Sequence, residues 1–129
     1  MGKPNGRTVV SQLIRAYEEE DRLYCGIEQA VVEQRDLLMN GRDPVKLNEL
    51  VEVQRRLAED IGKIESGIIP LREHLNRILA ASPGAEVQAL ADVLDEILER
   101  LATRIHAIVE VERDNTEQLL EPAPGSRIP

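Results

Sequence analysis

Apolar residues recur at alternating spacings of three and four along most of the chain, which is the pattern of helices that pack through a heptad seam. In the first third of the chain the seam consists of Val10, Leu13, Tyr17, Tyr24, Ile27, Val31 and Leu38. The same register passes through two polar residues, Glu20 and Gln34. We predict one helix from about Val9 to Met39, roughly 46 Å long at about 1.5 Å per residue, which is too long to bury its seam without neighbours.

A second helix is predicted to begin at Asp43 and Pro44, because aspartate caps free backbone amides and proline fits the first helical position. Its seam residues are Leu47, Leu50, Leu57, Ile61, Ile64, Ile68, Leu71, Leu75 and Ile78. Gln54 fills one further seam position. Since Pro70 lacks a backbone N–H and its ring crowds the preceding turn, we expect a kink or short break within residues 66–70, after which the helix resumes.

A third helix is predicted from about Ala85 to Leu120, after the helix-breaking residues 82–84. Its inward stripe consists of Leu90, Leu94, Ile97, Leu101, Ile105 and Ile108, widened by Leu98, Val109 and Val111. Because the connections between the helices are short, neighbouring helices are expected to be antiparallel.

The predicted fold is therefore all-α, an elongated three-helix up-down-up bundle with coiled-coil-like packing and a second helix kinked near Pro70. Residues 9–120 are expected to form a single helical-bundle domain. Residues 1–8 are expected to be a flexible N-terminus, and residues 121–129 a disordered, Pro-rich tail.

The chain is acidic and nearly free of aromatic residues. Its 129 residues include 24 Asp and Glu against 16 Lys and Arg, a net charge of -8, so a phosphate backbone would be repelled and no nucleic-acid partner is expected. Phe and Trp are absent, and Tyr17 and Tyr24 are the only tyrosines. Stacking surfaces for bases, sugars or flavins are therefore scarce.

Cysteine usage and hydropathy indicate the compartment. Cys25 is the only cysteine, so no internal disulfide can form, which is typical of a reducing compartment. The first residues lack the apolar run of a signal peptide, and no apolar stretch is long enough for a membrane span. We expect a cytoplasmic protein without membrane insertion.

The sequence predicts no catalytic residues, no metal ligands and no cofactor. His106 and Glu110 stand one helical turn apart, but two ligands without a third indicate a surface pair. Cys25 has no neighbouring cation on its helix that would activate it, so we expect inert packing. The acidic run 18–21 indicates a solvated face because consecutive helical residues point in different directions. Glu20 is the exception, since its seam position either fixes the register or marks an opening.

The C-terminal third of the chain combines the strongest negative charge with a wide apolar stripe. Residues 81–129 contain ten acids and four bases. An apolar face with an acidic border suits a helix of another protein. The alternative is that the stripe is used entirely inside the bundle, and the pattern leaves both open.

These helices resemble the flagellar export chaperones of the FlgN type, over about residues 13–120. The resemblance is carried by VEQRDLL at residues 32–38, by GRDPVKLNELV at 41–51, by Arg56, Leu57, Ile61, Ile64 and Glu65, and by Arg113, Asn115, Leu119 and Leu120 near the end. In that family a helix, a short turn of the Gly-Asp type and a second helix with a leucine pair follow one another in this order.

Membership would imply a non-enzymatic cytoplasmic chaperone that keeps hook-filament junction (hook-associated) proteins soluble for type III export and delivers them to the export gate. The C-terminal helix would bind the substrate. By position on that helix, the expected partner-binding residues are Ile105, Ile108, Val109, Val111, Asn115, Leu119 and Leu120. The acidic neighbours Glu110, Glu112 and Glu117 would bias partner choice more than affinity.

Two other functions are compatible with the pattern. The first is a homo-oligomeric coiled-coil scaffold or adaptor, in which Gln34 and Gln54 fix the register between copies. The second is a helical enzyme or metal-binding bundle that uses His106 with Glu110. For the chaperone, we expect Ile108→Asp to abolish partner binding and leave residues 9–80 folded.

Overall fold

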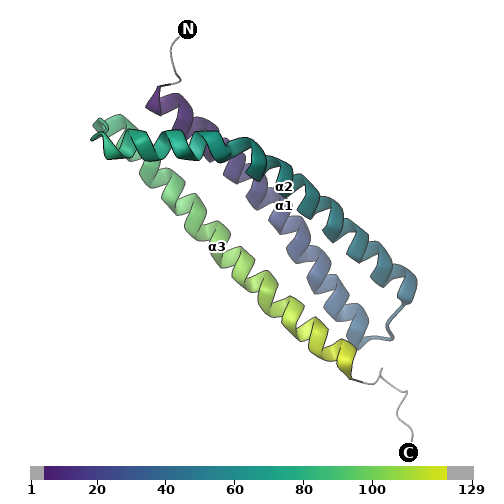
Figure 1. The fold of residues 1–129 in the computed structure, drawn as a ribbon. Helices are drawn as coiled ribbons and strands as arrows, with labels where there is room; N and C mark the ends of the chain where they lie inside the picture. Colours follow the sequence, from purple (N-terminus) through teal and green to yellow (C-terminus); the bar gives the residue numbers. More distant parts are fainter. Residues whose placement is uncertain (1–4, 122–129) are drawn as a thin grey trace, which may run out of the picture.

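The computed structural model describes residues 5–121, which form three long helices joined by short turns (Figure 1). The helices are α1 (Gly6–Met39), α2 (Pro44–Ala80) and α3 (Ala85–Leu120). α1 and α3 run in the same direction and α2 runs in the opposite one (Figure 1). No strand occurs within residues 5–121. The predicted all-α, up-down-up architecture is thus confirmed. We call the end where α1 ends, α2 begins and α3 ends the hairpin end.

Side-chain caps fix where the first two helices begin. The side chain of Asn5 accepts a hydrogen bond from the backbone N–H of Thr8 at 2.8 Å, so α1 begins at Gly6 and the expected flexible segment 1–8 is helical from residue 6 on. Asp43 accepts from the N–H groups of Val45 and Lys46 at the start of α2, as predicted. Residues 1–4, and residues 122–129 of the tail predicted at 121–129, lie outside the described residues.

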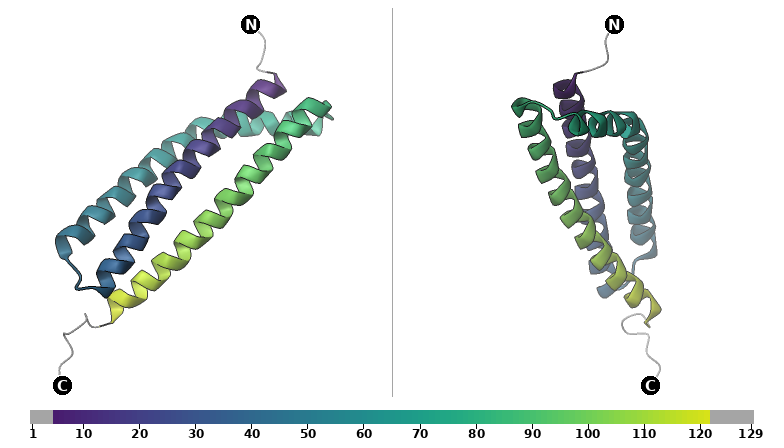
Figure 2. Two further views of the ribbon diagram at one scale, coloured as in Figure 1. Left: turned by 180° about the vertical axis from the view of Figure 1, so that it is seen from behind. Right: turned by 60° about the vertical axis from the view of Figure 1, so that its left-hand side comes forward.

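The central helix of the bundle is α1. It packs against both α2 and α3, whereas α2 and α3 make few contacts with each other over residues 5–121. α2 changes direction partway along its length, and its last part crosses the start of α1 towards α3 (Figure 2). Pro70 lies inside this helix, which remains helical throughout, so the predicted kink is present as a bend without a break.

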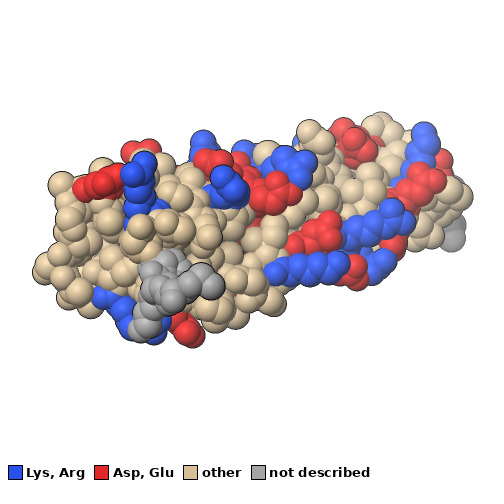
Figure 3. All heavy atoms as spheres, turned by 90° about the horizontal axis from the view of Figure 1, so that it is seen from above, with Lys and Arg blue, Asp and Glu red and all other residues tan. Residues whose placement is uncertain are grey.

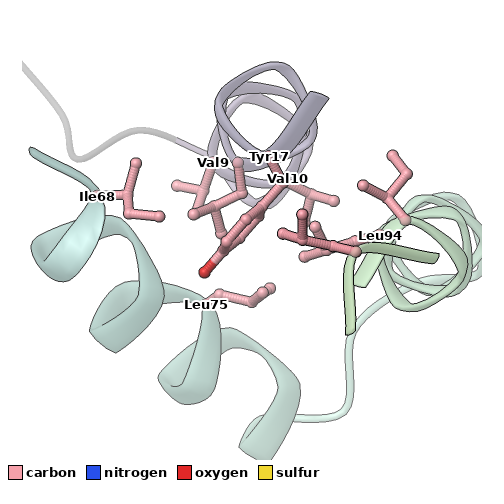
Figure 4. Packing of buried hydrophobic residues seen from close by; sticks show 9 residues of the cluster. Val9, Val10, Tyr17, Ile68, Leu75 and Leu94 are labelled. Atoms are coloured by element: carbon pink, nitrogen blue, oxygen red, sulfur yellow. The ribbon is translucent and has the colours of Figure 1, made fainter. Parts of the chain in front are cut away.

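The core consists of two clusters strung along α1. In the first, the Tyr17 ring extends from α1 towards α2, with Ile68 and Leu75 on the α2 side and Leu94 on the α3 side (Figure 4). The buried members of this cluster are Val9, Val10, Leu13, Tyr17, Ile68, Leu75, Leu94, Ile97 and Leu101. The buried members of the second cluster are Ile27, Val31, Ile61 and Ile108. Both clusters draw residues from all three helices, which is what holds α2 and α3 to the same central helix.

The first half of α2 is only partly covered. Its buried residues are Ile61, Ile68 and Leu75, so the seam residues at positions 44–60 stay at intermediate exposure. Two contacts nevertheless fix this half against α1. The amide of Gln54 donates to the Gln34 side-chain oxygen at 3.1 Å. Leu57 packs against the backbone of α1 at Gly26, where a Cβ would come within 2.9 Å of its terminal methyl group.

Candidate functional site

The seven α3 residues expected to bind a partner fall into two groups. Four lie at least partly inside the bundle: Ile105, Ile108, Val111 and Asn115. Three lie exposed on its surface: Val109, Leu119 and Leu120. The apolar stripe of α3 is therefore used largely within the chain, and only the second group faces outwards in this arrangement.

Asn115 holds α3 against α1. Its side chain is 3% exposed, and its Nδ2 donates to the backbone carbonyl of Val31 at 3.0 Å. Its Oδ1 is buried without a partner among the described residues. Because a buried amide is costly unless it is hydrogen-bonded, this contact favours one register of α3 along α1.

Arg104 forms a second polar bridge between α3 and α1, which the sequence pattern did not indicate. Its Nε donates to Asp21 and its Nη1 donates to Glu28, both at 2.9 Å. The hydrogen bond with Asp21 and the charges of Asp21 and Glu28 raise the pKa of the guanidinium further above its usual range. Asp21 thus belongs to an ion pair between helices and not to the solvated face predicted for the run 18–21.

Arg42 caps the end of α3 from the turn between α1 and α2. Its guanidinium donates to the carbonyls of Gln118 at 2.6 Å and Glu121 at 3.2 Å, and more weakly to that of Leu38. The last carbonyls of a helix lack intrahelical partners and carry negative partial charge, so a cation there is stabilising. Since α3 has no basic residue in its own last turn, Arg42 supplies this stabilisation from elsewhere in the chain.

Replacing Arg42 with alanine is expected to loosen the end of α3 and leave the rest of the bundle in place. The cost should be about 1 kcal/mol, because the hydrogen bonds are charge-assisted but partly exposed. Hydrogen exchange should become several-fold faster for the amides of residues 114–120 and remain unchanged at residues 20–31. Arg100→Ala on the exposed face of α3 is the control. Equal acceleration in both variants would show that Arg42 does not anchor this helix end.

A groove opens between α1 and α2 at the hairpin end. It has a volume of about 540 Å³. From α1 it is lined by Glu33, Asp36, Leu37 and Asn40, and from α2 by Lys46, Glu49, Leu50 and Val53. None of these lining residues comes from α3. The groove is thus a place where the α1–α2 seam is left uncovered, and its lining combines apolar side chains with three carboxylates and one ammonium group.

Three carboxylates line the groove without an ion-pair partner within residues 5–121: Glu33, Asp36 and Glu49. Carboxylates further along α2 do have such partners. On the next turns of α2, Arg55 pairs with Glu52 and Glu59, and Arg56 pairs with Glu52. The hydrogen bond from Arg55 and the nearby positive charges lower the pKa of Glu52 to about 2. Opposite charges also lie next to each other on the face shown in Figure 3. Most basic side chains of α2 therefore already interact with neighbouring side chains, whereas the carboxylates of the groove can still pair with cations of another molecule.

A buried carboxyl group lies on α1 where it faces the bend of α2. Glu20 is 1% exposed, and its Oε2 has no hydrogen-bond partner among the described residues. Burial, followed by hydrogen bonding and charge from Glu65, raises its pKa from 4.5 to about 8, against the opposing effect of Arg72. Burial also raises the pKa values of Tyr17 and Tyr24 beside it. The sequence placed Glu20 on the seam correctly, and its burial there favours the uncharged form of the carboxyl group.

The remaining candidates for chemistry do not form a metal-binding cluster within residues 5–121. The Nε2 of His106 lies 3.9 Å from the Glu110 carboxylate, and both side chains are largely exposed. Cys25 is a free thiol at intermediate exposure. Within residues 5–121 no three His, Cys, Asp or Glu side chains are grouped so that they could hold a metal ion.

Comparison of the chain with protein-family models, curated proteins and solved structures finds no match. No helix of the described part is both long and apolar enough to cross a membrane. The structural class of the protein is therefore defined by its fold, a three-helix bundle with an uncovered groove. The function is inferred from this fold and its surfaces.

Proposed function

We propose that the protein is a non-enzymatic cytoplasmic chaperone that binds amphipathic helices of another protein. The resemblance to FlgN-type export chaperones makes hook-filament junction proteins the proposed partners and type III export the proposed destination. Binding of this kind requires an accessible apolar surface and no catalytic group or cofactor.

The observation that carries the proposal is the gathering of exposed apolar side chains towards the hairpin end. Six of the ten large hydrophobic residues that are exposed within residues 5–121 lie in the last turns of α1 and α3 or the first turns of α2: Met39, Val45, Val51, Val53, Leu119 and Leu120. Leu120 is 84% exposed. Apolar surface concentrated at one end of a molecule is typical of a binding site, whereas single exposed apolar residues need no explanation.

Purified protein mixed with peptides of the C-terminal helices of hook-filament junction proteins should form a one-to-one complex in size-exclusion chromatography with light scattering. Leu119→Ser combined with Leu120→Ser should weaken this complex at least about tenfold, because apolar anchors dominate such interfaces. The matched control is Ile69→Ser with Val93→Ser, which removes two exposed apolar side chains away from the hairpin end. If none of these peptides forms a complex with the protein, the proposed function is wrong.

The homo-oligomeric scaffold has less support. That alternative uses Gln34 and Gln54 to set the register between copies, but the two side chains are hydrogen-bonded to each other within one chain. The same light-scattering measurement distinguishes the two functions. A stable homo-oligomer that ignores the added peptides would favour the scaffold.

A further inference from the structure

We propose that the groove between α1 and α2 binds about two turns of a basic amphipathic helix of the partner protein. This inference rests on the proposed function, since it assigns a docking position and a charge to the helix that the chaperone holds. It adds a contact on the α1–α2 hairpin to the exposed Leu119 and Leu120 at the end of α3, while the buried stripe of α3 stays inside the bundle.

The shape of the groove fits a helix. Its α1 residues span positions 33–40 and its α2 residues span positions 46–53, so the groove extends about 10 Å along each helix, which is two helical turns. The valley between two antiparallel helices is the position that a third helix takes in a bundle. No α3 residue lines the groove. The position of a third helix is therefore open on this side of the α1–α2 hairpin.

The apolar part of the lining determines what the inner face of the partner helix must be. Leu37 and Leu50 are partly exposed, and Val53 is 42% exposed. A helix that presents apolar side chains at i, i+3 or i+4, and i+7 would cover these three residues over two turns. Such an inner face is what makes the bound helix amphipathic.

The charge of the lining determines what the borders of the partner helix must be. Three carboxylates line the groove against one ammonium group. Lysine and arginine side chains flanking the apolar face of the partner would pair with Glu33, Asp36 and Glu49, which have no ion-pair partner in the described part of the chain.

A second copy of the same chain fits the groove poorly. The chain has a net charge of -8, and many of its basic side chains are already paired within the bundle: Arg22, Arg55, Arg56, Lys63, Arg72 and Arg104. Basic residues without an ion pair in the described part, such as Arg15, Arg35 and Arg100, are spread over α1 and α3 and form no continuous basic face two turns long. A helix from a different, basic segment can offer such a face, and charge complementarity would also speed its association.

Fluorescence anisotropy with two synthetic helical peptides tests the inference. Both carry leucine at i, i+3, i+4 and i+7, and one has lysine where the other has glutamate on the flanks. The full chain should bind the lysine peptide and not the glutamate peptide, and binding should weaken as the salt concentration rises. Binding of both peptides with equal affinity, or of neither, would overturn the inference.

Two pairs of variants locate the binding. Glu33→Gln with Asp36→Asn and Glu49→Gln should raise the Kd for the lysine peptide at least about tenfold. Asp95→Asn with Glu96→Gln and Glu99→Gln changes the net charge equally on the exposed face of α3 and should raise the Kd less than about threefold. Val53→Lys should block the groove, whereas Val51→Lys, two residues away on the same helix and outside the lining, should not. Equal effects within either pair would overturn the inference.

The outcome also separates this inference from the proposed function. If the hook-filament junction peptides bind the protein and the three groove substitutions leave their Kd unchanged, the chaperone function stands and the groove assignment is wrong. If the lysine peptide binds in the groove and no junction peptide binds, the groove assignment stands and the partner of the proposed function is wrong. If light scattering gives the wild-type protein the mass of two chains and the Val53→Lys variant the mass of one, a second copy occupies the groove. This result would overturn the inference.

Discussion

Replacing Ile108 with aspartate is expected to unfold the bundle and not merely to abolish partner binding. Ile108 is 5% exposed and is packed with Ile27 and Val31 of α1 and Ile61 of α2. A carboxylate at this position would be buried without a partner, at a cost of about 3–5 kcal/mol added to the lost apolar contacts. Domains of this size are stable by only about 5–15 kcal/mol. Circular dichroism at 222 nm should show loss of most helical signal or a strongly lowered melting temperature.

Val109→Asp is the matched control for this substitution. The residue is next to Ile108 on α3 but is 44% exposed, so its aspartate would be solvated and the melting temperature should change by only a few degrees. This expectation replaces the sequence-based one, in which Ile108→Asp left residues 9–80 folded. A variant with unchanged helicity and melting temperature would show that α3 does not pack on the hairpin through Ile108.

The heptad pattern was sufficient to predict the helices and their order. Alternating apolar spacings set the three seams, and the cap at Asp43 and the breakers at 82–84 set two helix starts to within a residue. The bend at Pro70 was also predictable, because the missing N–H and the ring act locally. The early start of α1 was missed although Asn5 three residues before Thr8 is a capping signal. Local rules therefore accounted for nearly all of the secondary structure.

The position of the candidate site was not predictable to the same degree. An apolar stripe shows that a helix face will be covered, but not whether its own chain or another chain covers it, and this is why Ile108 and Asn115 were assigned to a partner. The contacts of Arg42 and Arg104 join residues more than seventy positions apart, and no periodicity specifies them. The groove arises because α3 lines no part of it, which depends on the packing of the whole bundle.

The stability of the protein is expected to fall as pH rises from about 4.5 to about 8, because of Glu20. Its pKa is raised from 4.5 to about 8 in the folded state, chiefly by burial and then by Glu65. Below pH 4.5 both states hold the proton and there is no penalty. Between these values the unfolded chain releases the proton and the folded chain keeps it, so the free energy of unfolding decreases by at most about 1.4 kcal/mol per pH unit. Above pH 8 the folded state holds a buried carboxylate and the penalty is complete.

Glu20→Gln removes this titration, and its effect should therefore grow with pH. The glutamine amide can donate to Glu65 as the protonated carboxyl does, so near pH 5 the variant should be close to the wild type in stability. At pH 8.5 it should be more stable by a few kcal/mol, because no buried charge is formed. Urea unfolding followed by circular dichroism at pH 5, 6.5 and 8.5 measures the difference. Glu18→Gln, which neutralises an exposed neighbour, controls for net charge and should follow the wild-type pH dependence. Parallel curves for Glu20→Gln and the wild type would mean that Glu20 is already ionised in the folded protein and that Arg72 compensates its charge.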